Sequence, residues 1–177
     1  MKISIIGSGY VGLVSGAGLA EAGHNVVCMD VDEDRIAGLW KGKSPIYEPG
    51  LDEMLSDNVA REHLAFTTSL EDAVEHAEAL LIAVGTPPSE DGSADLGHVL
   101  AVATGIGQVL KEPLLVIVKS TVPVGTCDRV RNAIQEELDK RGESIDFSVA
   151  SNPEFLAEGG AIKDFMQPNR IVCGVEN

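Results

Sequence analysis

The chain has 177 residues, of which 44% are hydrophobic and 23% charged, a composition that suits one globular domain with its own core and excludes global disorder. Its formal net charge of −15, from 28 acidic and 13 basic residues, repels nucleic acid and anionic membrane surfaces, so neither is an expected partner. No apolar run approaches the roughly 20 residues of a membrane span. We therefore expect a soluble, cytoplasmic protein.

Short apolar runs alternate with helical patterns along the chain. Strands are predicted at Lys2–Ile6, Asn25–Asp30, Leu64–Thr67, Ala79–Val84, Leu114–Lys119, Phe147–Ser151 and Ile171–Gly174. Helices are predicted at about 10–23, 33–40, 50–57, 70–76, 95–110, 124–141 and 158–164. The strands are rich in Ile, Val and Leu with little polar alternation, as in strands that are covered on both faces. This order predicts an α/β fold, a Rossmann-like, doubly wound and mainly parallel sheet with helices on both faces.

Two segments between these elements are longer and more irregular than the rest. Lys41–Gly50 reads KGKSPIYEPG, and Gly85–Ser93 reads GTPPSEDGS. Long irregular loops in a compact domain are often functional, although a plain surface excursion is the alternative for both.

The three cysteines are Cys28, Cys127 and Cys173. Their odd number and wide spacing indicate no disulfide framework, which fits a reducing compartment. Because Cys28 and Cys173 lie inside strand-like apolar runs, we expect both to be buried structural thiols.

A glycine motif follows the first predicted strand. Lys2–Ile6 runs into Gly7-Ser8-Gly9-Tyr10-Val11-Gly12, and a helical pattern comes next. In a dinucleotide-binding βαβ unit the first of the three glycines allows the tight turn, the second lets the backbone approach the pyrophosphate, and the third lets the helix pack close to the strand. The helix N-terminus then supplies partial positive charge that an acidic chain otherwise lacks.

Asp30 ends the second predicted strand, 18 positions beyond Gly12, close to the usual ~20. A carboxylate there accepts hydrogen bonds from the ribose hydroxyls and repels a 2′-phosphate, which favours NAD over NADP. Arg35 complicates this preference, because a nearby arginine accommodates a 2′-phosphate. The alternative for Arg35 is an exposed helix residue that pairs with Asp32 or Glu33.

Polar, proline-stiffened turns follow three further predicted strands. They read Gly85-Thr86-Pro87-Pro88, Ser120-Thr121-Val122-Pro123 and Asn152-Pro153-Glu154-Phe155-Leu156. Ligands of open α/β sheets bind beyond the carboxyl ends of the strands, so these turns are expected to line one crevice. Taken alone, Thr86 and Thr121 could be turn or capping hydroxyls, and Glu154 could favour a helix start. Lys119 is either a site residue or a core lysine with its head group in water.

Read together, GSGYVG, MDVD, SPIYEPGLDEML, GTPPSEDGSADL, VKSTVPVGT and SNPEFLAEGGAIKDFMQPNRIVCG resemble the UDP-glucose/GDP-mannose dehydrogenase family over essentially the whole chain. NPEFLAEG and STVPVGT are far more specific than the glycine motif. The resemblance is closer to the UDP-glucose branch. It implies a four-electron oxidation of a sugar C6 alcohol to a carboxylate, in which two NAD are reduced and a cysteine holds the intermediate.

The resemblance also implies roles for individual residues. Gly7, Tyr10, Val11 and Gly12 would hold the pyrophosphate, Asp30 and Arg35 would contact the adenosine ribose, and Thr86 and Thr121 would lie along the cofactor. Glu154 matches the general acid/base, which chemistry of this kind needs to activate a water. Glu158 would lie near the nicotinamide. The segment Glu154, Phe155, Leu156, Ala157 and Glu158 would contribute backbone contacts to the sugar nucleotide.

One departure from the family pattern matters. Family members are more than twice this long, and their nucleophilic cysteine comes from a later part of the chain that none of Cys28, Cys127 and Cys173 matches. Residues 1–177 are therefore expected to be an NAD-binding domain, without the central helix and substrate domain of the family, that binds NAD but does not turn over UDP-glucose. The longer enzyme is expected to be a homodimer or larger. Three alternatives stay open: a dehydrogenase for GDP-mannose or a UDP-N-acetylhexosamine, a stand-alone nucleotide-binding module, and a 3-hydroxyacid-type dehydrogenase.

Overall fold

Six parallel strands form one sheet in the computed structural model, which describes residues 1–90 and 92–175. The strands are β1 (Lys2–Ile6), β2 (Asn25–Met29), β3 (Leu64–Thr67), β4 (Ala79–Ile82), β5 (Leu114–Val118) and β6 (Phe147–Ser151). Their order across the sheet is β3-β2-β1-β4-β5-β6. The strand order therefore reverses between β1 and β4, and the loop that follows β1 lies at this switch point, where open sheets of this kind bind ligands.

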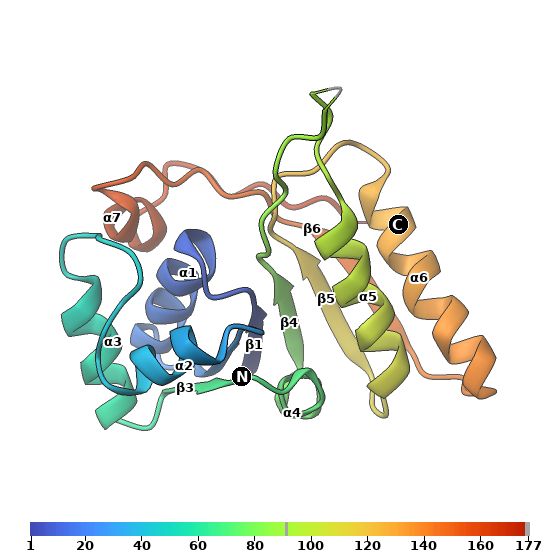
Figure 1. Cartoon of the computed structure of the whole chain (residues 1–177), viewed down its shortest axis with the longest axis horizontal. Coiled ribbons are helices and arrows are strands. Elements are labelled where there is room, and N and C mark those ends of the chain that lie inside the picture. The colour runs from blue at the N-terminus through green and yellow to red at the C-terminus, as the bar shows by residue number, and fades with distance from the viewer. Residues whose placement is uncertain (91, 176–177) are drawn as a thin grey trace.

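Helices cover both faces of the sheet (Figure 1). On one face lie α1 (Tyr10–Glu21), α2 (Glu33–Trp40), α3 (Leu51–Ala60) and α7 (Ala161–Met166), and on the other lie α4 (Leu70–His76), α5 (Gly97–Val109) and α6 (Thr126–Arg141). The alternation along β1 builds both cores, because Ile3 and Ile5 point to the α1 side and Ile6 to the α5 side. Ser4 points to the second side too, and its hydroxyl donates to the Ala73 carbonyl of α4 at 2.6 Å. The predicted doubly wound fold is confirmed.

The predicted strand at Ile171–Gly174 is wrong. Gly174 forms only an isolated antiparallel bridge with Ser151 at the end of β6. From β6 the chain crosses to α7, above α1 and α3, and then returns (Figure 1). The returning chain meets β6 at the carboxyl end of that strand. A further parallel strand would have to enter the sheet from the opposite edge, where the amino ends of the strands lie. Ile171 and Val175 are 70% and 71% exposed, so this apolar run does not belong to the core.

Of the two cysteines that were predicted to be buried, one is buried and one is exposed. Cys28 is completely buried beneath α1, as predicted, and burial raises the pKa of its thiol to about 12. The prediction for Cys173 is wrong, because this residue lies in the exposed segment after α7.

The boundaries of several elements differ from the prediction. The last helix begins at Ala161 rather than 158, because Gly159 has a φ of +84° and forms a turn before it. The helix predicted at 50–57 continues to Ala60. No helix among the described residues is long and apolar enough to cross a bilayer.

The packing of α5 against α6 generates the first prediction. A Cβ at Gly107 would lie 2.6 Å from the Ile134 carbonyl oxygen, whereas one at Gly38 in α2 would meet only the Lys43 carbonyl oxygen at 3.5 Å. Alanine gains ~1 kcal/mol over glycine inside a helix, and overpacking costs ~1–3 kcal/mol. Gly107→Ala should lower the free energy of unfolding in urea by about 1–2 kcal/mol, while Gly38→Ala should leave it equal or higher. Equal stability of the two variants would contradict this packing.

Candidate functional site

The loop after β1 places two glycines where no larger residue fits. Gly7 has a φ of +103°, and a Cβ there would lie 2.8 Å from the Ala83 carbonyl oxygen. A Cβ at Gly12 would lie 1.8 Å from the Gly7 carbonyl oxygen. At Gly9, in contrast, a Cβ would meet nothing within 4 Å. The first and third glycines therefore bring α1 close to β1, and the second faces open space into which a pyrophosphate fits.

The N-terminus of α1 points its backbone N–H groups into this space. Gly9 is its N-cap, and among the described residues no side chain caps this end and no acidic residue lies in its first turn. By comparison, Asp32 caps α2 and Ser69 caps α4 with side-chain oxygens. The terminus of α1 therefore offers uncapped backbone N–H groups and their partial positive charge to an anion.

Asp30 follows β2 and lies against the glycine loop. Its Oδ2 accepts from the Ser8 N–H at 2.8 Å, and its side chain is only 9% exposed. Arg35 Nη1 donates to the same oxygen at 2.8 Å, while its Nη2 lies 3.8 Å from Asp32. The expected partner Asp32 is thus the weaker one, and Arg35 pairs mainly with Asp30. One carboxylate at the end of β2 therefore joins the glycine loop to α2.

The turns after β4 and β5 meet at the same edge of the sheet. Thr86 Oγ1 donates to the Thr121 carbonyl at 3.0 Å, and Ser120 Oγ donates to the Val84 carbonyl at 2.7 Å. These hydroxyls connect two turns rather than cap a helix. The structure thus brings together the two threonines that the sequence singled out.

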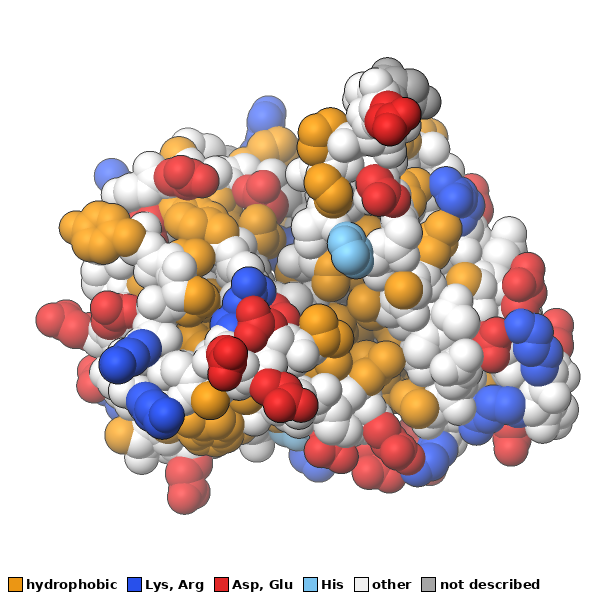
Figure 2. Space-filling view, viewed as in Figure 1, with side chains coloured by type: hydrophobic (Ala, Val, Ile, Leu, Met, Phe, Trp, Pro, Cys, Tyr) orange, Lys and Arg blue, Asp and Glu red, His pale blue; other side chains and the backbone are white. Residues whose placement is uncertain are grey.

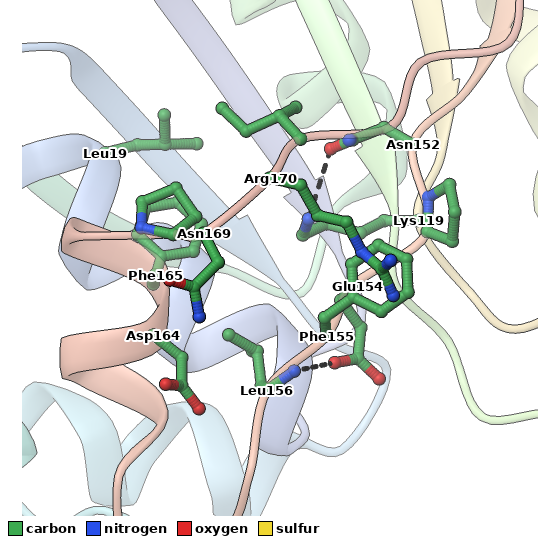
Figure 3. A pocket seen from close by; sticks show the side chains of 13 residues that line it. Leu19, Lys119, Asn152, Glu154, Phe155, Leu156, Asp164, Phe165, Asn169 and Arg170 are labelled. Atoms are coloured by element: carbon green, nitrogen blue, oxygen red, sulfur yellow. Dashed lines mark hydrogen bonds between the residues drawn. The ribbon is translucent and has the colours of Figure 1, made fainter.

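The segment after β6 lines a cavity of about 680 Å³ (Figure 3). Glu154 stands in this wall, and its Oε2 accepts from the Leu156 N–H at 2.6 Å. Phe155 is 51% exposed and stacks under the Arg170 guanidinium at 4.6 Å from the ring centre. The Ala157 N–H donates to Asp164 of α7 at 3.0 Å. Local contacts therefore fix individual residues of this segment.

Lys119 lies in the same cavity, although its residue is only 6% exposed. Its Nζ donates to Asn152 Oδ1 at 3.2 Å and lies 5.9 Å from the centre of the Phe165 ring. Burial lowers the pKa of this ammonium, and the nearby carboxylate of Glu154 partly opposes the shift. Lys119 therefore lines the cavity with a nearly buried side chain that bonds to Asn152.

Glu48 is a residue that the sequence analysis did not single out, although it lies in the irregular segment Lys41–Gly50. It is 5% exposed, and its carboxylate accepts from the Tyr10 hydroxyl and from the Gly159 and Ala161 N–H groups. The Tyr10 hydroxyl is thus engaged with protein groups, and the electrostatic influence of Glu158 also reaches it. In the sequence, Glu48 is recognisable only as an acidic residue between an aromatic residue and a proline in a long loop. This pattern does not reveal the residues that Glu48 contacts in the fold.

Comparison with known proteins places this geometry in a family. The model of the UDP-glucose/GDP-mannose dehydrogenase family, NAD binding domain, matches residues 1–177. The chain is 50% identical to the UDP-glucose 6-dehydrogenase of Pseudomonas aeruginosa and 51% identical to that of Rhizobium meliloti. These matches cover 98% and 99% of this chain but 38% and 40% of the relatives.

Solved structures agree with this result. A UDP-glucose dehydrogenase from Pyrobaculum islandicum superposes with a TM-score of 0.93 at 46% identity, covering 99% of this chain and 40% of that one. A GDP-mannose dehydrogenase from Pseudomonas aeruginosa gives 0.92 at 40% identity, covering 100% and 41%. The chain thus spans about two fifths of the length of the relatives that it matches.

The electrostatic influence of Glu154 on Lys119 generates the second prediction. Glu154→Gln removes the negative charge that partly opposes the effect of burial, so it should lower the pKa of Lys119 further. A pH titration of the lysine side-chain NMR signals measures this pKa. Glu158→Gln is the matched control, because Glu158 is not among the groups that shift Lys119, and it should leave the titration unchanged. An unaltered Lys119 titration in Glu154→Gln would show that the two groups do not interact.

Proposed function

Because the chain belongs to the UDP-glucose/GDP-mannose dehydrogenase family and matches its NAD-binding domain, we propose that its glycine loop and Asp30 hold NAD within an enzyme that oxidises the C6 alcohol of a UDP-sugar. The observation that carries this proposal is the meeting of the glycine loop and the Asp30 carboxylate at the switch point of the sheet. Few other ligands match an uncapped helix terminus with an acceptor for ribose hydroxyls beside it.

The residues at this edge fit NAD rather than NADP. The open side of Gly9 leaves room for a pyrophosphate at the start of α1, where Tyr10, Val11 and Gly12 supply backbone N–H groups. Asp30 is an acceptor for the adenosine ribose and would repel a phosphate on its 2′ position. Arg35 is the group that would favour such a phosphate, but it is paired with Asp30 at 2.8 Å. The pair therefore engages the guanidinium that a 2′-phosphate would need.

The other turns supply the chemical groups. When bound, NAD accepts a hydride, and oxidation of an alcohol to a carboxylate reduces two NAD in succession. Thr86 and Thr121 lie along the path from the glycine loop toward Glu154, and Glu158 is proposed to lie near the nicotinamide. Glu154 is proposed as the general acid/base, since it is held at the cavity wall by the Leu156 N–H. Phe155, Leu156 and Ala157 would contact the sugar nucleotide with their backbone.

The substrate is proposed to be UDP-glucose, which the oxidation converts to UDP-glucuronate. The curated relatives near 50% identity are named UDP-glucose 6-dehydrogenase, whereas the GDP-mannose dehydrogenase structure is 40% identical. GDP-mannose and UDP-N-acetylhexosamines are the alternative substrates. The whole enzyme is proposed to act as a homodimer or larger assembly in the cytoplasm.

Replacement of Asp30 generates the third prediction. Asp30→Ala should weaken NAD binding by roughly 10- to 150-fold, because a charge-assisted hydrogen bond contributes ~1.5–3 kcal/mol, and should reduce the preference for NAD over NADP. Isothermal titration calorimetry with each cofactor measures both effects. Asp34→Ala is the matched control, since this exposed carboxylate lies in the first turn of α2.

The wild-type titrations test the proposal itself. NAD should bind and NADP should bind more weakly, while UDP-glucose should bind weakly or not at all to these 177 residues. No NADH should form with UDP-glucose, because none of the three cysteines matches the family nucleophile. Equal affinity for NAD and NADP would contradict the role of Asp30. NADH formation would contradict the proposal that these 177 residues bind NAD but do not turn over UDP-glucose.

A further inference from the structure

The segment Asn152–Gly160 carries both proposed catalytic-site carboxylates, yet it contains no helix or strand. It crosses the sheet edge from β6 toward α7, which lies beside α1 and α3 (Figure 1). Its near end is tied to the sheet, because the Asn152 N–H donates to the Val118 carbonyl at 2.9 Å. An irregular chain of this length needs a second anchor if Glu154 and Glu158 are to keep a constant position.

Glu48 provides that second anchor. Its Oε2 accepts from the Gly159 N–H at 2.7 Å, and its Oε1 accepts from the Ala161 N–H at 2.9 Å. Helix α7 begins at Ala161, and the residue at its N-cap, Gly160, has no side chain to satisfy these donors. The acceptor is instead the carboxylate of Glu48, which lies in a loop more than a hundred residues earlier in the chain.

The same carboxylate reaches the cofactor loop. The Tyr10 hydroxyl donates to Glu48 Oε2, and it also accepts from the Gly159 N–H at 3.2 Å. Tyr10 is the first residue of α1, directly after the glycine loop. A single buried carboxylate therefore joins the start of α1 to the end of the segment that carries Glu154.

The electrostatics agree with an ionised Glu48. The Tyr10 hydroxyl is the main cause that lowers the pKa of Glu48, and the backbone N–H groups of Gly159, Ala161 and Ile162 lower it further. Burial and the bond to Glu48 raise the pKa of Tyr10 to about 12. The contacts of an acid with a lowered pKa are lost only when the pH falls below its ordinary range, and those of a tyrosine with a raised pKa only when the pH rises above 10. The three-way contact is therefore complete at neutral pH.

We propose that Glu48 is a positioning residue that couples the NAD-binding loop to the segment Asn152–Gly160, so that the bound cofactor and Glu154 keep a constant separation. The proposal rests on the proposed function, because it assigns Glu48 a task only if NAD binds at the glycine loop. Glu48 is proposed to act without touching the cofactor or the substrate. It acts through Tyr10 on one side and through the Gly159 and Ala161 amides on the other.

Two variants separate the two halves of this contact. Glu48→Gln keeps the size of the side chain but replaces one of the two acceptor oxygens with an amide N–H₂, so it cannot accept from both backbone donors and should loosen the segment. Tyr10→Phe removes the tie to the glycine loop and the longer of the two Gly159 N–H contacts, and leaves the shorter Glu48 contacts with Gly159 and Ala161. Glu53→Gln is the matched control, because it makes the same change on an exposed residue in the first turn of nearby α3.

Hydrogen–deuterium exchange of residues 153–162, with and without saturating NAD, is the measurement. In the wild type and in Glu53→Gln, NAD should slow exchange of this segment. In Glu48→Gln, exchange without NAD should be about tenfold faster at the amides of Gly159 and Ala161, and the NAD effect should be lost. In Tyr10→Phe, exchange without NAD should stay near the wild-type rate, while the NAD effect on the segment should disappear.

The outcomes distinguish this proposal from the proposed function. If calorimetry detects no NAD binding by the wild type, the proposed function fails and the coupling fails with it. If NAD binds but Glu48→Gln and Tyr10→Phe keep the NAD-dependent protection of residues 153–162, the coupling alone is overturned. If Glu48→Gln does not fold, Tyr10→Phe decides the question, because it removes one hydroxyl and no charge.

Discussion

The close approach of α1 to β1 is the constraint on which the rest of the structure depends. A Cβ at residue 12 would lie 1.8 Å from the Gly7 carbonyl oxygen, and one at residue 7 would lie 2.8 Å from that of Ala83. Only glycine at both positions lets the helix start directly above the ends of β1 and β4. This placement puts the positive end of α1 at the switch point, beside Asp30 and within reach of Glu48.

Local groups at this edge work against the charge of the whole chain. Acidic side chains are spread over the face shown in Figure 2, and the formal net charge is −15. A dianionic pyrophosphate would therefore be attracted by the α1 terminus rather than by the overall field. Three of the described cations lie near the crevice. Arg35 is paired with Asp30, Lys119 is influenced by the carboxylate of Glu154, and Arg170 lies over the Phe155 ring. The balanced charges at this edge serve to position groups more than to attract a ligand.

Much of this arrangement could be predicted from the sequence, because it depends on local signals. Apolar runs indicated the six strands, and the glycine spacing indicated the tight turn between β1 and α1 against which Asp30 lies. The strand at Ile171–Gly174 was predicted wrongly, because its apolar pattern does not reveal that the chain returns to β6 at the carboxyl end. Glu48 could not be recognised, since its partners Tyr10, Gly159 and Ala161 are far away in sequence and two of them contribute only backbone atoms.

The most direct test of the account is a titration of the ¹⁵N-labelled chain with NAD, followed by the chemical shifts of the backbone amides. The account places the cofactor on the glycine loop, beside Asp30 and along the turns that carry Thr86 and Thr121. The largest shift changes should therefore occur at residues 7–12, at Asp30 and in these two turns, with smaller changes in the segment around Glu158. Changes confined to other surfaces, or none at saturating NAD, would contradict it.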